Sequence, residues 1–174
     1  MTVGWLNERS RNGGVDEIPL PAAPGRLFLC GKHFIGPDAE AAMERCGATV
    51  VVCLNERDEL EARYPEYVRW LSSNWPGRAI WHPIPDLHAP ALVDAITLVD
   101  ELTDLLRRGE NLLLHCGAGI GRAGTTAVCV LLNLGLTADV ALATVGAHRP
   151  MAGPEVGVQR DLVDAIEAHV RSTG

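Results

Sequence analysis

Residues 111–126, NLLLHCGAGIGRAGTT, contain the pattern that decides the fold. Three consecutive leucines form a short apolar run of the kind found in a buried strand. The chain then passes Cys116 into a segment with glycine at every second position, and an apolar helical segment begins at Arg122. This order predicts a strand, a glycine-rich loop and a helix.

The glycine-rich loop has the chemistry of an anion-binding site. Glycines at alternate positions let successive backbone N–H groups face inward, and the following helix adds the positive end of its dipole. A thiol at a helix N-terminus beside an arginine is favoured as the nucleophilic thiolate. Arg122 follows Cys116 closely enough to return across the loop and present its planar fork to two phosphate oxygens. We therefore expect Cys116 to be a nucleophile and Arg122 to clamp a bound oxyanion.

This stretch resembles the signature of the cysteine-dependent protein tyrosine and dual-specificity phosphatases, in which His-Cys is followed by five residues and Arg. In that family the histidine before the cysteine, here His115, hydrogen-bonds the loop backbone and supports the thiolate without transferring a proton. The resemblance implies that the substrate phosphate is bound by Gly117, Ala118, Gly119, Ile120, Gly121 and Arg122.

Two further residues occupy positions at which the resembling family places functional groups. Asp86 lies in the sequence PIPD at a strand-to-loop exit before Cys116, where the family keeps its general acid, although an aspartate there could instead cap a turn. Gln159 lies in a segment that resembles the late loop whose glutamine orients the hydrolytic water, and an ordinary helix-surface glutamine is the alternative. His88, near Asp86, is expected to be a solvent-exposed loop residue.

Composition favours one domain and excludes several classes of partner. The chain has 174 residues, 47% of them hydrophobic, which is enough for a single sizeable core. Its net charge of -7 is scattered along the sequence and argues against nucleic acid or an anionic membrane as a partner. Neither a signal peptide nor a membrane-spanning run is expected, and the five cysteines lack zinc-site spacing. We therefore expect a cytoplasmic protein and infer no metal or organic cofactor.

Segments with strand and helix patterns alternate along the chain. Residues 1–25 are rich in glycine and proline and are expected to form an irregular arm, whereas residues 26–174 are expected to form a single catalytic domain. Besides the central strand, strands are expected at 26–30, 48–54 and 79–83, and helices at 37–47, 90–108, 122–134, 137–148 and 154–171. The pattern predicts an α/β fold with a central mixed sheet flanked by helices. The resembling dual-specificity phosphatases match this order of elements over roughly residues 26–171.

The sequence thus predicts a cysteine-dependent phosphatase that acts on a phosphorylated protein or peptide, with the oligomeric state left open. Phosphotyrosine is the first choice, because the loop has none of the basic residues found in phosphoinositide-directed members; phosphoserine or phosphothreonine is the second. A phosphoprotein-binding pseudophosphatase, and a different anion chemistry such as sulfur transfer or arsenate reduction, are the alternatives. Cys53 could form a reversible disulfide with Cys116, although a core thiol is the simpler interpretation.

Ala123 departs from the resembling family, which usually has serine or threonine directly after the arginine to donate a hydrogen bond to the thiolate. A hydrogen bond to a charged sulfur contributes on the order of 1.5 to 3 kcal/mol. Its absence makes the thiolate a poorer leaving group when the phosphocysteine is hydrolysed, unless Thr125 or Thr126 replaces it. We expect Ala123→Ser to raise kcat, measured by steady-state and stopped-flow hydrolysis of p-nitrophenyl phosphate. Unchanged turnover together with no pre-steady-state burst would contradict this hypothesis.

Overall fold

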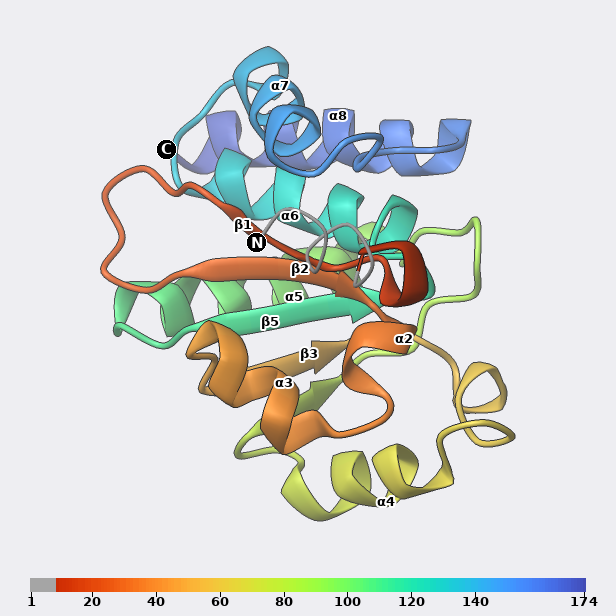
Figure 1. Ribbon diagram of the computed structural model, residues 1–174. Coiled ribbons are helices and arrows are strands. Elements are labelled where there is room, and N and C mark those ends of the chain that lie inside the picture. Colours follow the sequence, from red (N-terminus) through yellow and green to blue (C-terminus); the bar gives the residue numbers. More distant parts are fainter. Residues whose placement is uncertain (1–8) are drawn as a thin grey trace.

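Residues 9–174 are described by the structure, a computed structural model in which five strands form one mixed sheet (Figure 1). The strands are β1 (Val15–Ile18), β2 (Leu27–Gly31), β3 (Val50–Cys53), β4 (Ala79–Trp81) and β5 (Leu112–Cys116). Their order across the sheet is β1-β2-β5-β3-β4. β1 pairs antiparallel with β2, whereas every other neighbouring pair is parallel. The predicted α/β class with a mixed central sheet is therefore confirmed.

Helices cover both faces of the sheet, which explains why β3 and β5 are apolar along almost their whole length. One face packs against α5 (Leu92–Arg107) and α6 (Gly121–Asn133), and the other against α2 (Lys32–Ile35), α3 (Ala39–Cys46) and α4 (Pro65–Asn74). A short 3-10 helix, η1 (Arg57–Glu59), precedes α4. Alternate residues of β5 enter different cores: Leu112 and Leu114 join the α5–α6 side, and Leu113 joins the α3–α4 side.

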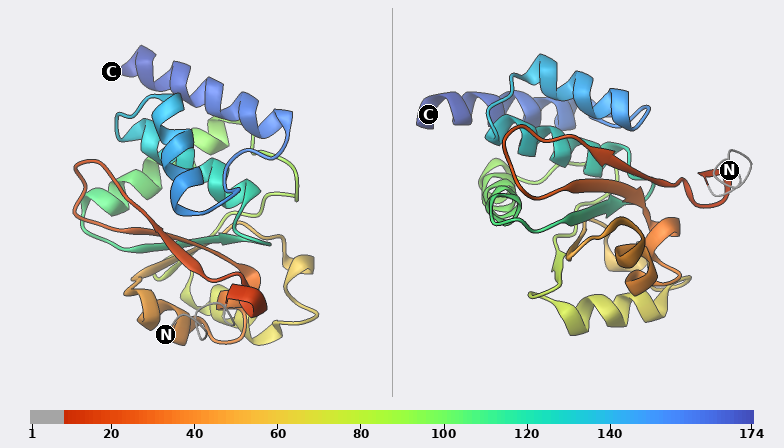
Figure 2. Two further views of the ribbon diagram at one scale, coloured as in Figure 1. Left: turned by 45° about the horizontal axis from the view of Figure 1, so that its top comes forward. Right: turned by 60° about the vertical axis from the view of Figure 1, so that its left-hand side comes forward.

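Helix α6 is the centre of the larger core. Its residues are buried from the first turn to the last full turn, as the apolar run from Val128 to Leu132 predicts. Helices α7 (Ala138–His148) and α8 (Gly157–Thr173) lie beyond α6 on the side away from the sheet (Figure 2). The start of α6 is therefore enclosed by protein on most sides, so a loop that leads into it has a fixed position.

Three features of the fold differ from the sequence-based expectation. Strand β1 lies inside residues 1–25, which were expected to be irregular, because the backbone of residues 15–18 pairs with β2 at the edge of the sheet. Helix α2 was not expected, since four residues are too few for a helical period to be visible. Helix α8 begins at Gly157, after Pro154, and so Pro154 does not lie in its first turn.

Several helix ends follow their expected sequence signals. Gly47 ends α3 with a left-handed backbone (φ 75°), and the Asp38 side chain accepts a hydrogen bond from Ala41 N at its start. Thr137, the first residue of the helix expected at 137–148, caps α7 by accepting a hydrogen bond from Val140 N, and Pro65 begins α4. Among residues 9–174, no helix combines the length and apolar character that crossing a membrane requires.

The packing of α6 leaves no room for a side chain at Gly124. A Cβ atom built there lies 2.2 Å from the backbone nitrogen of Gly153. We predict that Gly124→Ala lowers the free energy of unfolding by about 1–3 kcal/mol, the usual effect of overpacking a rigid contact. Urea unfolding would measure the change.

Gly157→Ala is the matched control, because nothing lies within 4 Å of a Cβ built at this first residue of α8. We expect it to leave stability unchanged or to raise it slightly, since alanine has the higher helix propensity. Equal effects of the two substitutions would show that the contact at Gly124 is not a constraint.

Candidate active site

Four segments that follow the parallel strands meet at one edge of the sheet. β2 leads into Lys32, β3 into residues 54–59, β4 into residues 82–86, and β5 into residues 117–120. Parallel strands place their carboxyl ends at the same edge, where α/β proteins commonly bind ligands. The cavity at this edge is lined by Lys32, Glu59, Asp86, Leu87, Cys116, Gly117, Ala118, Gly121, Arg122 and Glu155. Its volume of about 240 Å³ is small for a ligand site and suits a single phosphorylated side chain.

The loop after Cys116 keeps its carbonyl groups occupied and its amides available. The carbonyl of Gly117 accepts a hydrogen bond from Lys32 N, and those of Ala118 and Gly119 accept from the Arg149 side chain. The Ile120 carbonyl accepts from two backbone amides. Within residues 9–174, by contrast, the amides of residues 117–120 donate to no protein acceptor. Such a loop can bind an anion through its amides, as the glycine pattern predicts.

Gly119 is the position at which the loop requires glycine. Its backbone is left-handed (φ 74°), and a Cβ atom would lie 2.4 Å from the carbonyl oxygen of Cys30. Any side chain would therefore be strained by its backbone conformation and would push the loop away from β2. The alternate glycines of the sequence thus have a structural cause at the centre of the loop.

The sulfur of Cys116 lies at the end of β5 and accepts a hydrogen bond from the backbone nitrogen of Ala123 at 3.5 Å. Within residues 9–174, no hydroxyl donates to this sulfur in place of the serine or threonine that the resembling family has after the arginine. Thr126 donates its hydroxyl to the Arg122 carbonyl, and the buried Thr125 hydroxyl has no partner among the described residues. Neither threonine therefore replaces the missing donor to the thiolate.

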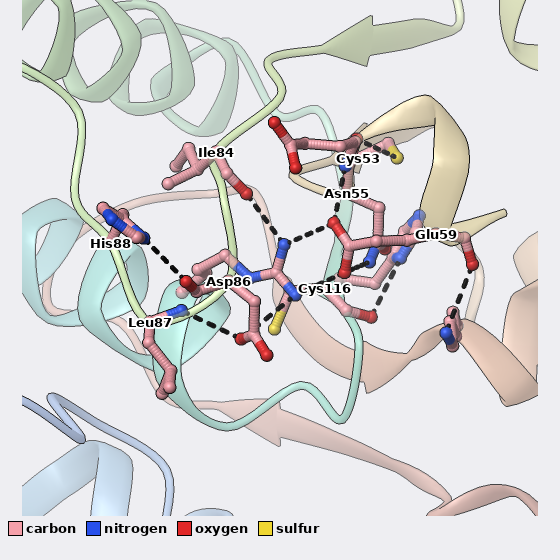
Figure 3. Close-up of polar contacts among 12 residues, drawn as sticks. Cys53, Asn55, Glu59, Ile84, Asp86, Leu87, His88 and Cys116 are labelled. Atoms are coloured by element: carbon pink, nitrogen blue, oxygen red, sulfur yellow. Dashed lines mark hydrogen bonds and ion pairs between the residues drawn. The ribbon is translucent and has the colours of Figure 1, made fainter.

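Arg122 is a buried cation whose side chain is only 3% exposed, and Glu59 holds it in place. Both terminal nitrogens of the guanidinium bind the Glu59 carboxylate at 2.8 Å, and one also donates to the Ile84 carbonyl at 2.8 Å (Figure 3). Burial lowers the pKa of Arg122 and the Glu59 hydrogen bonds raise it, with a net rise. A two-point contact of this kind fixes the orientation of the planar group as well as its position.

Glu59 is itself fixed by neighbouring groups. Its carboxylate accepts hydrogen bonds from the Asn55 side chain at 3.0 Å and from the Glu56 backbone nitrogen at 2.7 Å. Burial raises the pKa of Glu59, while hydrogen bonds from Arg122 lower it, and the net shift is downward. The segment after β3 thus supplies a rigid carboxylate under the arginine of the loop.

Asp86 lies at the mouth of the cavity and reaches toward Arg122. Its carboxylate is 3.4 Å from the Arg122 guanidinium, and its side chain is 69% exposed. The same oxygen accepts a hydrogen bond from the backbone nitrogen of Leu87, and the Asp86 carbonyl contacts the His88 ring at 2.7 Å (Figure 3). Asp86 therefore lies in a local turn and also lines the cavity, and its role as general acid stays a prediction. His88 is exposed and does not line the cavity.

His115 faces away from the cavity. Adjacent residues of a strand point to opposite sides, and the His115 ring packs against Tyr67, whose hydroxyl it contacts in the core beneath the sheet. Burial lowers the pKa of His115 to about 4, so the ring is neutral at neutral pH. This geometry suits a supporting residue and gives it no path to a bound substrate.

Gln159 does not line the cavity, whereas Glu155 does. The Gln159 side chain is buried and accepts from the backbone nitrogen of Glu155 at 2.8 Å; it also donates to the His88 carbonyl at 3.3 Å. It therefore ties the start of α8 to the loop that carries Asp86. The helix-surface alternative for Gln159 is wrong, because the residue is only 1% exposed, and its role in orienting the hydrolytic water stays a prediction.

Cys53 and Cys116 belong to different cores on opposite faces of the sheet. Burial raises the pKa of Cys53 to about 12, so its thiol stays protonated near neutral pH. The arrangement favours a core thiol over a redox partner. All five cysteines are free, and within residues 9–174 no cluster of three potential ligands is arranged to hold a metal ion.

Arg149 holds the loop from the side opposite the cavity. Its side chain, 3% exposed, donates to the carbonyls of Gly119 at 2.9 Å and Ala118 at 2.8 Å. A third nitrogen forms an ion pair with Asp16 of β1 at 2.8 Å. This arginine comes from the end of α7, so the loop is joined to both the edge strand and the helical layer.

Sequence reasoning missed Glu59, Arg149, Lys32 and Glu155. Each is far from Cys116 along the chain, and none lies in a motif that marks it as part of a site. One signal was available for Glu59: an arginine that must be buried near a helix start requires a carboxylate or a bound anion as partner. The sequence does not say which of its acidic residues would be that partner.

Comparison with known proteins identifies the family. Residues 23–169 match the model "PTP-SAK: Swiss Army Knife protein, DSP-PTPase phosphatase domain". The chain belongs to the DSP-PTPase phosphatase family. The resemblance inferred from the signature is thereby confirmed.

Curated relatives agree with this assignment. Cyclin-dependent kinase inhibitor 3 of Sus scrofa is 30% identical over 132 residues, which are 76% of this chain and 61% of the relative. Dual specificity protein phosphatase 14 of Homo sapiens is 32% identical over 94 residues, 52% of this chain and 48% of the relative. The chain thus spans about three fifths or less of the length of these family members.

Solved structures of the family have the same fold. Tk-PTP in its active form aligns with a TM-score of 0.65 and 26% identity, covering 85% of this chain and 97% of that one. Kinase associated phosphatase (KAP), with its catalytic-site cysteine replaced by serine, aligns with a TM-score of 0.75 and 20% identity, covering 91% and 96%. The second likeness concerns the fold alone.

The Arg149 contacts predict a large effect on stability. Arg149→Met removes hydrogen bonds to two loop carbonyls. It also removes one of the positive charges that neutralise the largely buried carboxylate of Asp16. We expect the free energy of unfolding to fall by about 3 kcal/mol, the scale found when one partner of a buried ion pair is removed. Urea unfolding at neutral pH would measure it.

Arg160→Met is the control for this substitution, since its ion pair with Asp164 is about half exposed on both sides. An exposed pair contributes at most about 1 kcal/mol. Similar losses for both variants would contradict the role assigned to Arg149.

Proposed function

We propose that the protein is a cysteine-dependent protein phosphatase that hydrolyses phosphomonoesters through a phosphocysteine intermediate. The observation that carries the proposal is the convergence of Cys116, Arg122 and Asp86 on one cavity, with the Asp86 carboxylate 3.4 Å from the guanidinium. These groups come from two different strand ends, 30 residues apart in the chain. A nucleophile, an anion clamp and a carboxyl group at the mouth are the parts that phosphoryl transfer to a thiolate requires.

In the first step, the Cys116 thiolate attacks phosphorus while the bond from phosphorus to the leaving oxygen breaks. Protonated Asp86 gives its proton to that oxygen, so an alcohol or phenol leaves. The amides of the loop and the Arg122 guanidinium hold the three non-bridging oxygens, on which negative charge is concentrated. Because Glu59 fixes Arg122 beforehand, little reorganisation is needed at that moment.

In the second step, water attacks phosphorus and the Cys116 sulfur leaves as thiolate. Asp86, now a carboxylate, takes a proton from the water, and inorganic phosphate is released. The thiolate would be stabilised by the Ala123 backbone amide without a hydroxyl donor, so this second step is expected to limit turnover. No metal or organic cofactor has a part in either step.

Phosphotyrosine in protein is the proposed substrate, with phosphoserine or phosphothreonine second. The family assignment supports phosphoprotein as the substrate class. The small cavity and the absence of basic residues at loop positions 117, 118 and 120 are consistent with a phosphorylated side chain. A cytoplasmic location remains part of the proposal.

The missing hydroxyl donor at position 123 also supports a second candidate, a phosphoprotein-binding pseudophosphatase. In that case the loop amides and Arg122 would bind a phosphorylated residue, and the phosphocysteine would form or break too slowly to matter. Binding and turnover must therefore be measured on the same variants.

Hydrolysis of p-nitrophenyl phosphate by wild type, Cys116→Ser and Asp86→Asn tests the proposed enzyme. We expect vanadate-sensitive turnover that Cys116→Ser abolishes and that Asp86→Asn lowers by about 10²-fold or more, the usual effect of a general acid. The effect of Asp86→Asn should be larger on a phosphotyrosine peptide, because its phenoxide is a poorer leaving group than p-nitrophenoxide and needs the proton more.

Asp94→Asn is the matched control, since it removes an exposed carboxylate on α5 that does not line the cavity. Its kinetics should equal those of wild type. Turnover that survives in Cys116→Ser would refute the mechanism. Tight phosphopeptide binding without turnover in wild type would favour the pseudophosphatase instead.

A further inference from the structure

Lys32 is the one lysine in a chain whose other cationic side chains are arginines, and it lines the active-site cavity. It follows β2 directly and begins α2. Lysine and arginine differ in how they bind anions: the guanidinium is a rigid fork, whereas the ammonium is a compact charge on a flexible stem. The one lysine ammonium of the chain thus lines the same cavity as Cys116.

The backbone of Lys32 is fixed against the phosphate loop. Its N–H donates to the Gly117 carbonyl at 2.9 Å. The preceding residue, Gly31, lies so close to the loop that a Cβ atom there would be 2.8 Å from the same carbonyl oxygen. The start of α2 therefore keeps its position relative to the loop, and the flexible Lys32 side chain extends from a backbone fixed beside it.

The Lys32 side chain has no carboxylate partner among residues 9–174. Its one recorded contact is a hydrogen bond to the backbone carbonyl of Glu59 at 3.2 Å. The other cations that touch the loop, Arg122 and Arg149, are both in buried ion pairs. An ammonium can donate three hydrogen bonds, so Lys32 keeps two for a ligand.

Glu155 gives another part of the cavity the opposite charge. Its carboxylate lies against the first residue of α6, where a Cβ atom on Gly121 would be 2.0 Å from a carboxylate oxygen. An anionic group of a substrate is repelled from that part of the cavity and attracted toward Lys32. The cavity lining is therefore uneven in charge, with Lys32 at the Gly117 end of the phosphate loop and Glu155 at the Gly121 end.

We propose that Lys32 binds a second anionic group of the substrate, next to the phosphorylated residue that is hydrolysed. This inference rests on the proposed phosphatase function and adds a substrate class: phosphoprotein segments with an acidic side chain or a second phosphorylated residue beside the target. The scissile phosphate does not need Lys32, because the loop amides and Arg122 provide its contacts. A protein with net charge -7 repels acidic segments in general, so a local cation is required to accept one.

The test uses three phosphotyrosine peptides that differ only in the neighbouring residue, which is glutamine, glutamate or phosphoserine. The measured quantity is the kcat/KM of each anionic peptide divided by that of the glutamine peptide. For wild type we expect ratios of about two to five, the range for a partly exposed charge pair. Lys32→Met should bring them to about one, and Lys32→Arg should keep them above one because the charge remains. The glutamate and phosphoserine arms show which anion the site prefers.

A purely structural role of Lys32 has a different outcome. Loss of the hydrogen bond to the Glu59 carbonyl could shift Arg122, but this would lower kcat/KM for all three peptides equally and leave the ratios unchanged. Unchanged ratios in Lys32→Met would overturn the proposal. Arg69→Met, which removes an exposed positive charge on α4 outside the cavity, is the matched control and should keep the wild-type ratios.

Peptide binding separates this proposal from the proposed function. Fluorescence anisotropy with Cys116→Ser, alone and combined with Lys32→Met, measures the same ratios as dissociation constants without hydrolysis. If wild type hydrolyses none of the peptides but Lys32 still governs the binding ratios, the phosphatase proposal fails and the Lys32 site stands. If neither binding nor hydrolysis depends on the neighbouring anion, the Lys32 site is refuted, whatever the turnover of the wild type.

Discussion

The ion pair between Arg122 and Glu59 is the interaction on which the geometry of the cavity depends. A buried guanidinium requires a compensating charge, and Glu59 supplies it through two hydrogen bonds of 2.8 Å. The pair joins the segment after β5 to the segment after β3, and the Ile84 carbonyl adds the segment after β4. Three strand ends that are distant in sequence are thus held at fixed separations around Cys116.

A second buried arginine, Arg149, fixes the phosphate loop on the side opposite the cavity. Arg149 occupies the carbonyls of Ala118 and Gly119, and Lys32 N occupies that of Gly117. Because each peptide unit points its carbonyl and its N–H in opposite directions, fixing the carbonyls outward directs amides into the cavity. The anion preference of the loop is therefore a result of contacts made to its carbonyl groups by the Arg149 side chain and the Lys32 backbone nitrogen.

Charges at the cavity have separate tasks. Arg122 is locked before any ligand arrives, Asp86 is exposed at the mouth, and Lys32 and Glu155 give the lining unequal charge. An exposed carboxylate at a turn can approach and leave a bound substrate more readily than one enclosed in the core. Arg122 is buried and can hold an anion rigidly, whereas Asp86 is exposed and can reach a bound substrate to transfer a proton.

The sequence by itself determined the class of fold, the loop with Cys116 and Arg122, and the position of Asp86 before a loop, because these depend on local patterns of apolar, glycine and proline residues. It did not reveal β1, since edge pairing depends on a partner strand rather than on local periodicity. It predicted a supporting role for Gln159 but not the contacts of this buried side chain with Glu155 and His88, nor the place of Glu155 in the cavity lining. Only the tertiary structure decided that Glu59, Arg149 and Lys32 surround the loop. Glu59 and Lys32 meet it because parallel strands bring their carboxyl ends to one edge, and Arg149 meets it because α7 packs against α6 and β1. No local pattern in a sequence specifies which segments share that edge.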